Sequence, residues 1–193
     1  MIKAAIIGCG KIADEHADLL ARLSGCTIVG VCDQEELMAK QLAERYNVGN
    51  YFVDVREMMK TVQPDVVHIT TPPQSHFSLG SLCLEAGAHI FIEKPFTVTT
   101  QETEALIELA RSKNRKVTVG HNNQFSHESM EMRALVKAGF LGGPPIHMES
   151  IFPYGLQDPY GQALLGDKNH WVRALPGKLL HNVISHAVCK IAE

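Results

Sequence analysis

The chain has 193 residues, of which 45% are hydrophobic and 20% are charged, and its formal net charge is −3. A chain of this length forms one domain, or one domain and part of a second, and its apolar content argues against disorder. The slightly negative charge and the scattered Lys and Arg residues give no reason to expect a nucleic acid or an anionic membrane surface as partner.

Short apolar runs alternate with amphipathic stretches through the first 120 residues. The runs of strand length are 4–7, 27–32, 65–69, 89–92 and 116–119, and the stretches with helical spacing lie around 11–23, 35–46, 75–86 and 100–113. Nearly continuous apolar strands are typical of a parallel sheet covered on both faces, and their alternation with helices implies right-handed crossovers. The predicted class is α/β, with a Rossmann doubly wound parallel sheet in residues 1–120.

The first strand leads into the segment GCGKIA, which fits the pattern G-x-G-x-x-G/A. The pattern carries weight here because it follows a strand and opens a helix. Gly8 permits the tight turn, Gly10 lets a pyrophosphate approach the backbone, and Ala13 lets the helix pack close to the strand. The free N–H groups of the helix N-terminus attract phosphate. The residues expected to bind a dinucleotide here are Gly8, Gly10, Lys11, Ile12 and Ala13.

An acidic residue, Asp33, ends the second strand. It lies about 20 residues beyond the glycine turn, where a carboxylate binds the adenosine ribose hydroxyls of a dinucleotide. Such a carboxylate repels a 2′-phosphate, so the sequence favours NAD over NADP. Capping of the next helix by Asp33 is an alternative role, and the two roles are compatible.

Polar segments follow two later strands: TTPPQSH after 65–69 and Glu-Lys-Pro after 89–92. Ligands bind at the carboxyl ends of the strands in an open α/β sheet. We therefore expect these segments to line the cofactor crevice, although His76 equally fits an ordinary residue of a first helical turn. The residues expected to contact the cofactor are Thr71, Pro72, His76, Glu93 and Lys94.

Lys94 is also a candidate catalytic residue, because its position at a strand end directs it toward the crevice. Its ammonium can stabilise a developing alkoxide, and a desolvated lysine can act as an acid or a base. The alternative is a solvated surface charge. The Lys94-Pro95 bond is a candidate cis peptide.

The pattern changes after Gly120. A helix is predicted at 126–138, a strand at 146–152, a long loop at 153–177 and a last helix at 179–193. A single strand between two helices cannot bury its own faces. Residues 121–193 therefore predict the start of an incomplete α+β substrate domain. We expect apolar surface to be exposed at 146–152 and 179–191, with association of chains through this region or partial order beyond about residue 125.

No pattern of a signal peptide, membrane span or metal site is visible. Charged residues interrupt the first apolar stretch, and no run of 18 apolar residues exists. The five cysteines are odd in number and lack CxxC spacing, which indicates reduced, mostly buried thiols in a cytoplasmic protein. The ten histidines form no HExxH motif and no Cys/His cluster at ligand spacing, so no metal is expected.

Taken together, these motifs resemble the Gfo/Idh/MocA oxidoreductase family over nearly the whole chain. The resemblance rests on the GxGxxA turn, the acidic end of the second strand, the TPPxxxH loop and Glu-Lys-Pro, in that order. It implies a Rossmann domain followed by an α/β domain built on an open, mostly antiparallel sheet. It also implies NAD- or NADP-dependent oxidation or reduction of sugars, inositols and related polyols, in oligomers that associate through that sheet.

The resemblance extends to the last helix, where the family carries an Asp and, four residues later, a His. This sequence has Asn182 and His186 at these positions, which with Lys94 are the implied catalytic set. Residues four apart share one helix face. Asn182 can orient a ligand but is no general base, so His186 is the candidate base. A structural histidine is the alternative. Gln124 also stands where the family often has Arg.

The leading hypothesis is an NAD-dependent dehydrogenase that acts on a CH–OH group of a small sugar, nucleotide sugar or cyclitol. One alternative is a non-catalytic regulatory protein that keeps the nucleotide site, since some relatives with this fold act as repressors. Another is an inactive fragment that retains only cofactor binding. The substrate class rests on family analogy, because a fold does not fix a function.

Overall fold

The computed structural model describes residues 1–151 and 155–189, which form two compact units, Met1–Gly120 and His121–Glu193. The first unit is built on one six-stranded sheet. Its strands are β1 (Ile2–Ile7), β2 (Cys26–Cys32), β3 (Tyr51–Phe52), β4 (Val66–Ile69), β5 (His89–Ile92) and β6 (Val117–Val119). All the pairs are parallel, and the order is β3-β2-β1-β4-β5-β6. This is the doubly wound Rossmann order, so the predicted fold class is confirmed.

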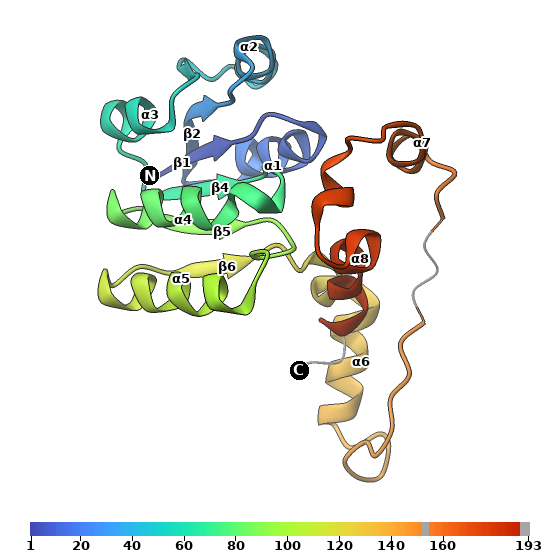
Figure 1. Ribbon diagram of the computed structural model, residues 1–193. Helices are drawn as coiled ribbons and strands as arrows, with labels where there is room; N and C mark the ends of the chain where they lie inside the picture. Colours follow the sequence, from blue (N-terminus) through green and yellow to red (C-terminus); the bar gives the residue numbers. More distant parts are fainter. Residues whose placement is uncertain (152–154, 190–193) are drawn as a thin grey trace. The chain divides into compact units, whose positions relative to one another are not determined.

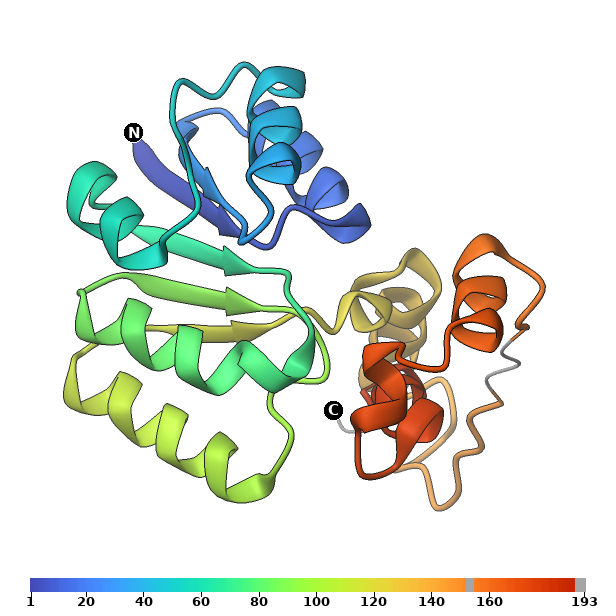
Figure 2. The ribbon, with the colours of Figure 1, turned by 45° about the horizontal axis from the view of Figure 1, so that its top comes forward.

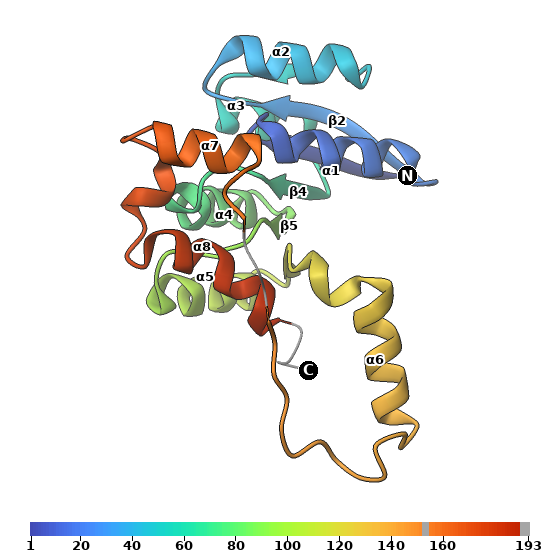
Figure 3. The ribbon, with the colours of Figure 1, turned by 90° about the vertical axis from the view of Figure 1, so that its right-hand side faces the viewer.

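Helices cover both faces of the sheet, and side chains alternate between these faces along each strand. Ala5 and Ile7 of β1 pack with α3 (Val55–Val62), α4 (His76–Glu85) and α5 (Thr100–Ser112). Figures 1 and 2 show α4 and α5 side by side on this face. Ala4 and Ile6 face α1 (Lys11–Arg22) and α2 (Glu36–Arg45) instead, and Figure 3 brings α1 to the front. Burial on both faces explains the continuously apolar strands.

Two elements of the first unit, β3 and α3, were not predicted. A strand of two residues is too short to show alternation. The helix α3 did carry a start signal, because the side chain of Asp54 accepts a hydrogen bond from the Glu57 backbone N–H at 2.8 Å. An Asp followed three residues later by Glu is a common helix start.

The second unit contains α6 (His127–Lys137), α7 (Pro159–Gly166) and α8 (Lys178–Val188), with short 3-10 turns at Asn122–Phe125 and Trp171–Ala174. The strand predicted at 146–152 is wrong over residues 146–151, which form no strand, and residue 152 lies outside the described residues. An extended segment becomes a strand only with a partner ladder. Residues 121–151 and 155–189 supply no such partner.

The predicted loop 153–177 contains the unpredicted helix α7, which begins at a capping residue, Asp158, and at Pro159. The last helix was predicted over 179–193. It is observed as α8, and residues 190–193 lie outside the described part of the chain.

Apolar side chains of the second unit are exposed where the sequence predicted them. Ile146 and Ile151 are 100% and 79% exposed, and Leu180 on α8 is 64% exposed. Ile184 and Val188 continue the exposed apolar line of α8. The second unit therefore presents uncovered apolar surface on a helix and on an irregular segment.

None of the helices in the described part of the chain has the length and hydropathy needed to cross a membrane. All five cysteines are free thiols, and four of them are buried.

Candidate functional site

The turn after β1 depends on Gly8, whose φ of +91° lies in the left-handed region. A Cβ at this position would lie 2.7 Å from Thr71 Cγ2 and 2.9 Å from Thr71 N. Both the backbone conformation and the close approach of the segment after β4 therefore require glycine. This is the tight turn that the sequence predicted.

Gly10 has a different role, because a Cβ built on it would meet no protein atom within 4 Å. It is the N-cap of α1, and no side chain caps this helix end. The Ala13 N–H donates to the Gly10 carbonyl oxygen at 3.0 Å, and no side chain covers the earlier N–H groups of α1. Lys11 is exposed, Ile12 is half-buried and Ala13 is fully buried under the helix. A bare, positively polarised helix end beside a glycine with free space fits the pyrophosphate of a dinucleotide.

Asp33 joins the glycine turn to the end of β2. Its Oδ2 accepts the Cys9 N–H at 2.7 Å, and its Oδ1 accepts the Glu35 N–H at 2.9 Å. The N-cap of α2 is Glu35 rather than Asp33, so the alternative role as helix cap is not observed. The carboxylate is partly exposed and fixes the turn that it adjoins.

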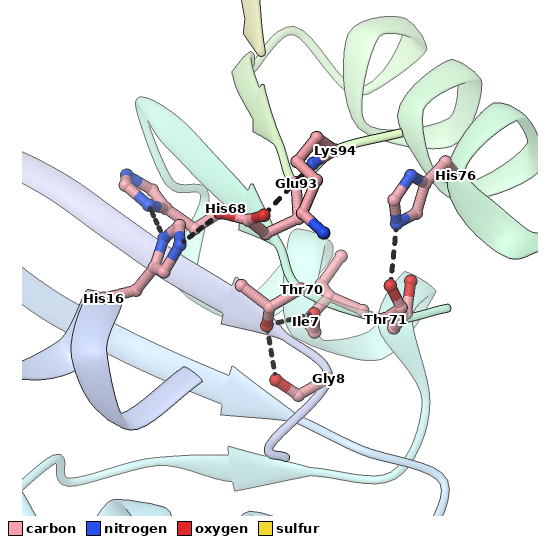
Figure 4. Close-up of polar contacts among 9 residues, drawn as sticks. All are labelled: Ile7, Gly8, His16, His68, Thr70, Thr71, His76, Glu93 and Lys94. Atoms are coloured by element: carbon pink, nitrogen blue, oxygen red, sulfur yellow. Dashed lines mark hydrogen bonds and ion pairs between the residues drawn. The ribbon is translucent and has the colours of Figure 1, made fainter. Parts of the chain in front are cut away.

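Thr70 also fixes the glycine turn, a role that was not predicted from the sequence. Its hydroxyl is buried, with Oγ1 lying 2.6 Å from the Gly8 carbonyl oxygen, to which it donates, and 3.1 Å from that of Ile7 (Figure 4). The order of the sheet places β4 beside β1. The loops after these two strands therefore meet at the point where the strand order reverses, which is the ligand position in such folds.

His76 is held by backbone carbonyl groups of two loops. Its ring is fully buried, and Nε2 lies 2.8 Å from the Thr71 carbonyl oxygen (Figure 4). Nδ1 lies 2.9 Å from the Pro95 carbonyl oxygen. Burial lowers the pKa of His76, although these backbone hydrogen bonds oppose the shift. The ring therefore ties the segment after β4 to the segment after β5, and its contact with a cofactor stays a prediction. Thr71 and Pro72 remain partly or fully exposed.

Glu93 and Lys94 follow β5, and the Lys94-Pro95 peptide bond is cis. Burial lowers the pKa of Lys94, while the nearby charge of Glu93 raises it. Glu93 Oε2 accepts the Lys94 backbone N–H at 3.1 Å, and Oε1 lies 3.0 Å from Nε2 of His16. The Glu93 carboxylate is thus engaged by protein groups at both oxygens. The geometry gives the carboxylate a role in holding the Lys94 backbone, and the contact of Glu93 with the cofactor stays a prediction.

His16 and His68 were not predicted as site residues. His16 lies on α1 three residues after the buried Ala13, and this helical spacing toward the sheet was the available signal. Nδ1 of His16 lies 2.8 Å from Nδ1 of His68 on β4. Burial, followed by the proximity of His16, lowers the pKa of His68 to about 4, against the opposing charge of Glu93.

The lowered pKa of His68 predicts an acid-sensitive fold. The unfolded chain binds a proton at His68 below about pH 6.5, and the folded chain binds it only near pH 4. The contribution of the neutral His68 to the free energy of unfolding is therefore complete above pH 6.5 and is lost as the pH falls toward 4. From about pH 7.5 to pH 5, the free energy of unfolding should fall by about 2 kcal/mol more in the wild type than in His68→Gln. Urea unfolding at the two pH values measures this difference.

The matched control is His89→Gln, on the neighbouring strand β5, where Nδ1 accepts the Lys116 N–H at 2.9 Å. It should keep the extra acid loss of the wild type. An equal loss in wild type and His68→Gln would contradict the assignment of this pH dependence to His68.

In the second unit, Asn182 and His186 lie on α8 as predicted, but each has a protein partner. Asn182 is 3% exposed, and its Nδ2 donates to the Tyr160 hydroxyl of α7 at 3.3 Å. Nδ1 of His186 lies 3.0 Å from the side-chain amide nitrogen of Asn123. Asn123 was not assigned a role from sequence, although it follows β6 closely. Lys94 belongs to the first unit, so its grouping with Asn182 and His186 stays a prediction.

A metal site is not formed by the described residues, among which no group of three His, Cys, Asp or Glu side chains could hold an ion.

The doubly wound sheet, the glycine turn at its switch point and the acidic end of β2 define a Rossmann protein of the dinucleotide-binding class. The chain belongs to the Gfo/Idh/MocA family: the family model, described as an oxidoreductase family with an NAD-binding Rossmann fold, matches residues 2–121. The resemblance inferred from the motifs is thereby confirmed for residues 2–121.

Two relatives and one solved structure illustrate the similarity. The chain is 31% identical to D-glucoside 3-dehydrogenase of Escherichia coli (strain K12), over 73% of this chain and 40% of that protein. It is 32% identical to UDP-N-acetylglucosamine 3-dehydrogenase of Acidithiobacillus ferrooxidans, over 77% and 44%. The structure of scyllo-inositol dehydrogenase from Lactobacillus casei with bound NAD(H) and scyllo-inositol matches with a TM-score of 0.70 at 24% identity, over 74% of this chain and 42% of that one. The chain thus spans less than half the length of these relatives.

Proposed function

We propose that this chain binds NAD(H) and serves an oxidoreductase that transfers hydride between the nicotinamide and a CH–OH carbon of a sugar, nucleotide sugar or cyclitol. The observation that carries the proposal is that two features adjoin the same turn. Gly10 faces open space at the bare N-terminus of α1, and the carboxylate of Asp33 accepts the Cys9 N–H beside it. The names of the relatives support the substrate class, since they act on a glucoside, a nucleotide sugar and an inositol.

The residues present fit the cofactor. Gly8, Gly10, Lys11, Ile12 and Ala13 would hold the pyrophosphate, Asp33 the adenosine ribose, and Thr71 and Pro72 would line the crevice at the switch point. The carboxylate of Asp33 favours NAD over NADP. When bound, the nicotinamide supplies the hydride acceptor, and the protein supplies position and field.

Lys94 and His186 would handle the proton and the charge of the substrate hydroxyl. Lys94 would stabilise the developing alkoxide, and His186 would take the hydroxyl proton at Nε2. For this, Nε2 must be unprotonated, which requires the Asn123 amide to present its oxygen to a proton on Nδ1. In the structure the side-chain nitrogen of Asn123 faces Nδ1 of His186. Because the oxygen and nitrogen of an amide are assigned from hydrogen bonding, proton transfer requires the flipped amide, whose oxygen faces Nδ1.

A first test is titration of the chain with NADH and NADPH, followed by nicotinamide fluorescence, and then a screen of polyols and sugars for NADH formation. Lys94→Met should retain saturable NADH binding but reduce turnover of an active polyol by about a hundredfold or more. Lys113→Met, at an exposed lysine at the end of α5, is the matched control and should leave both unchanged. Absence of NADH binding by the wild type would refute the proposal.

A second candidate function is a non-catalytic regulatory protein that retains the nucleotide site. The observation in its favour is that Asn182 replaces the family's acidic residue and is 3% exposed, hydrogen-bonded to Tyr160. Saturable NADH binding without substrate-dependent NADH formation, across the polyol and sugar screen, would favour this function.

The partner proposed for this chain, besides its small-molecule substrate, is a second copy of itself. The exposed apolar side chains of the second unit, among them Ile146, Ile151 and Leu180, support association through the C-terminal region.

The free cysteines support a reducing, cytoplasmic location.

A further inference from the structure

Three polar side chains from three separate elements form a hydrogen-bonded chain that ends at Lys94. His68 lies on β4, His16 on α1, and Glu93 just after β5. The Nδ1 atoms of the two histidines are 2.8 Å apart, and His16 Nε2 lies 3.0 Å from Glu93 Oε1. The other oxygen of Glu93 accepts the Lys94 backbone N–H at 3.1 Å. Figure 4 shows this succession from His68 to Lys94.

Packing restricts each member of this chain. The side chains of His16 and Glu93 are only 11% and 15% exposed. Phe91 of β5 stacks on the His68 ring, with centroids 4.9 Å apart and planes at 3°, and it meets the His16 ring edge-on at 5.2 Å. A Cβ on Gly120 would lie 2.5 Å from Glu93 Oε1. The carboxylate therefore fills the space that the absent side chain of Gly120 leaves.

The number of protons follows from the geometry. Two ring nitrogens at hydrogen-bond distance share one proton between them. With His16 neutral, His68 donates from Nδ1 and His16 donates from Nε2 to Glu93. With His16 cationic, it donates from both nitrogens and His68 accepts. In either case an N–H of His16 points at Glu93, so the carboxylate keeps its partner in both charge states of His16.

We propose that His16 and His68 are positioning residues for Lys94, which act by clamping the Glu93 carboxylate against the lysine backbone. The inference rests on the proposed function, in which Lys94 meets the substrate hydroxyl. The clamp keeps the carboxylate of Glu93 from turning toward the lysine ammonium and holds the amine in its water-poor setting. Loss of the clamp would let the carboxylate pair with the amine or admit water, and both changes favour the charged amine.

The experiment follows the amine of Lys94 itself in the unliganded chain. Reductive methylation with ¹³C-formaldehyde labels the lysines, Lys94→Arg identifies the Lys94 signal, and its ¹³C shift is recorded against pH. In His16→Leu the midpoint of this titration should rise by about one pH unit relative to the wild type. In His16→Gln, whose amide can still donate to Glu93, it should rise less. His89→Gln is the matched control and should leave the midpoint unchanged.

A second measurement uses the wild type alone, so it does not depend on the folding of a variant. Long-range ¹H–¹⁵N spectra of the wild type should show a protonated Nε2 on His16 at every pH at which the fold is intact. A bare Nε2 on His16, or an unchanged Lys94 midpoint in folded His16→Leu, would overturn the proposal. Neither readout uses NADH, so a failure of the positioning role is distinguished from a failure of cofactor binding, which the NADH titration tests separately.

Discussion

Gly10→Ala is expected to weaken NADH binding by about tenfold or more, while the free energy of unfolding falls by no more than about 1 kcal/mol. The added methyl group meets no protein atom within 4 Å, so the fold has room for it. The space that it enters is the space expected for the pyrophosphate at the bare end of α1. Fluorescence titration with NADH and urea unfolding of the same preparation measure the two quantities.

Gly8→Ala provides the contrast at the other glycine of the turn. Here the Cβ would overlap Thr71 Cγ2 and the Thr71 backbone nitrogen, at a φ of +91°. We expect a loss of stability of about 2–4 kcal/mol, from left-handed backbone strain together with overpacking. A Gly10→Ala protein that binds NADH as tightly as the wild type would refute the assignment of this turn to the pyrophosphate.

Replacing Asp33 by asparagine is expected to raise the ratio of NADPH affinity to NADH affinity by about tenfold or more. The negative charge that repels a 2′-phosphate disappears, and so does one strong acceptor for the ribose hydroxyls. Asparagine keeps one oxygen, which can still accept the Cys9 N–H that Asp33 accepts at 2.7 Å. Parallel titrations with NADH and NADPH give the ratio.

Alanine at the same position serves a different purpose. Asp33→Ala removes both backbone contacts, to Cys9 and Glu35, so it should lower affinity for both cofactors by loosening the turn. Glu35→Gln, at a neighbouring exposed carboxylate, controls for a general change of charge. An unchanged NADPH-to-NADH ratio in folded Asp33→Asn would contradict the specificity role of this carboxylate.

The Rossmann unit was predictable because its signals are local and repeated. Strands buried on both faces are apolar throughout, and the glycine turn has a fixed spacing from Asp33. The strand β3 was missed because it pairs through only two residues. The strand predicted over 146–151 was wrong because these mixed apolar and polar residues have no neighbouring strand among the described residues. Strand formation depends on a partner elsewhere in the chain, which periodicity does not report.

The site was predictable at strand ends and much less so in the contacts behind them. Lys94 and Asp33 lie where the strand pattern puts them. His16 and His68 are 52 residues apart in sequence, and only the order of the sheet brings α1 and β4 together. His76 matched a motif, yet its buried ring bonds to backbone carbonyls. A motif gives the identity of a residue, whereas the direction of its side chain depends on packing.

The contacts that hold the glycine turn also bear on the thermodynamics of cofactor binding. The turn is fixed by the Thr70 hydroxyl at Gly8, by Asp33 at Cys9, and by the Gly8 N–H at the Cys32 carbonyl, 2.8 Å away. A loop that is held in one conformation before binding loses little conformational entropy on association, so more of the interaction energy remains as affinity. Because the turn is fixed by these contacts, we expect cofactor binding there to resemble docking onto a rigid surface more than folding around a ligand.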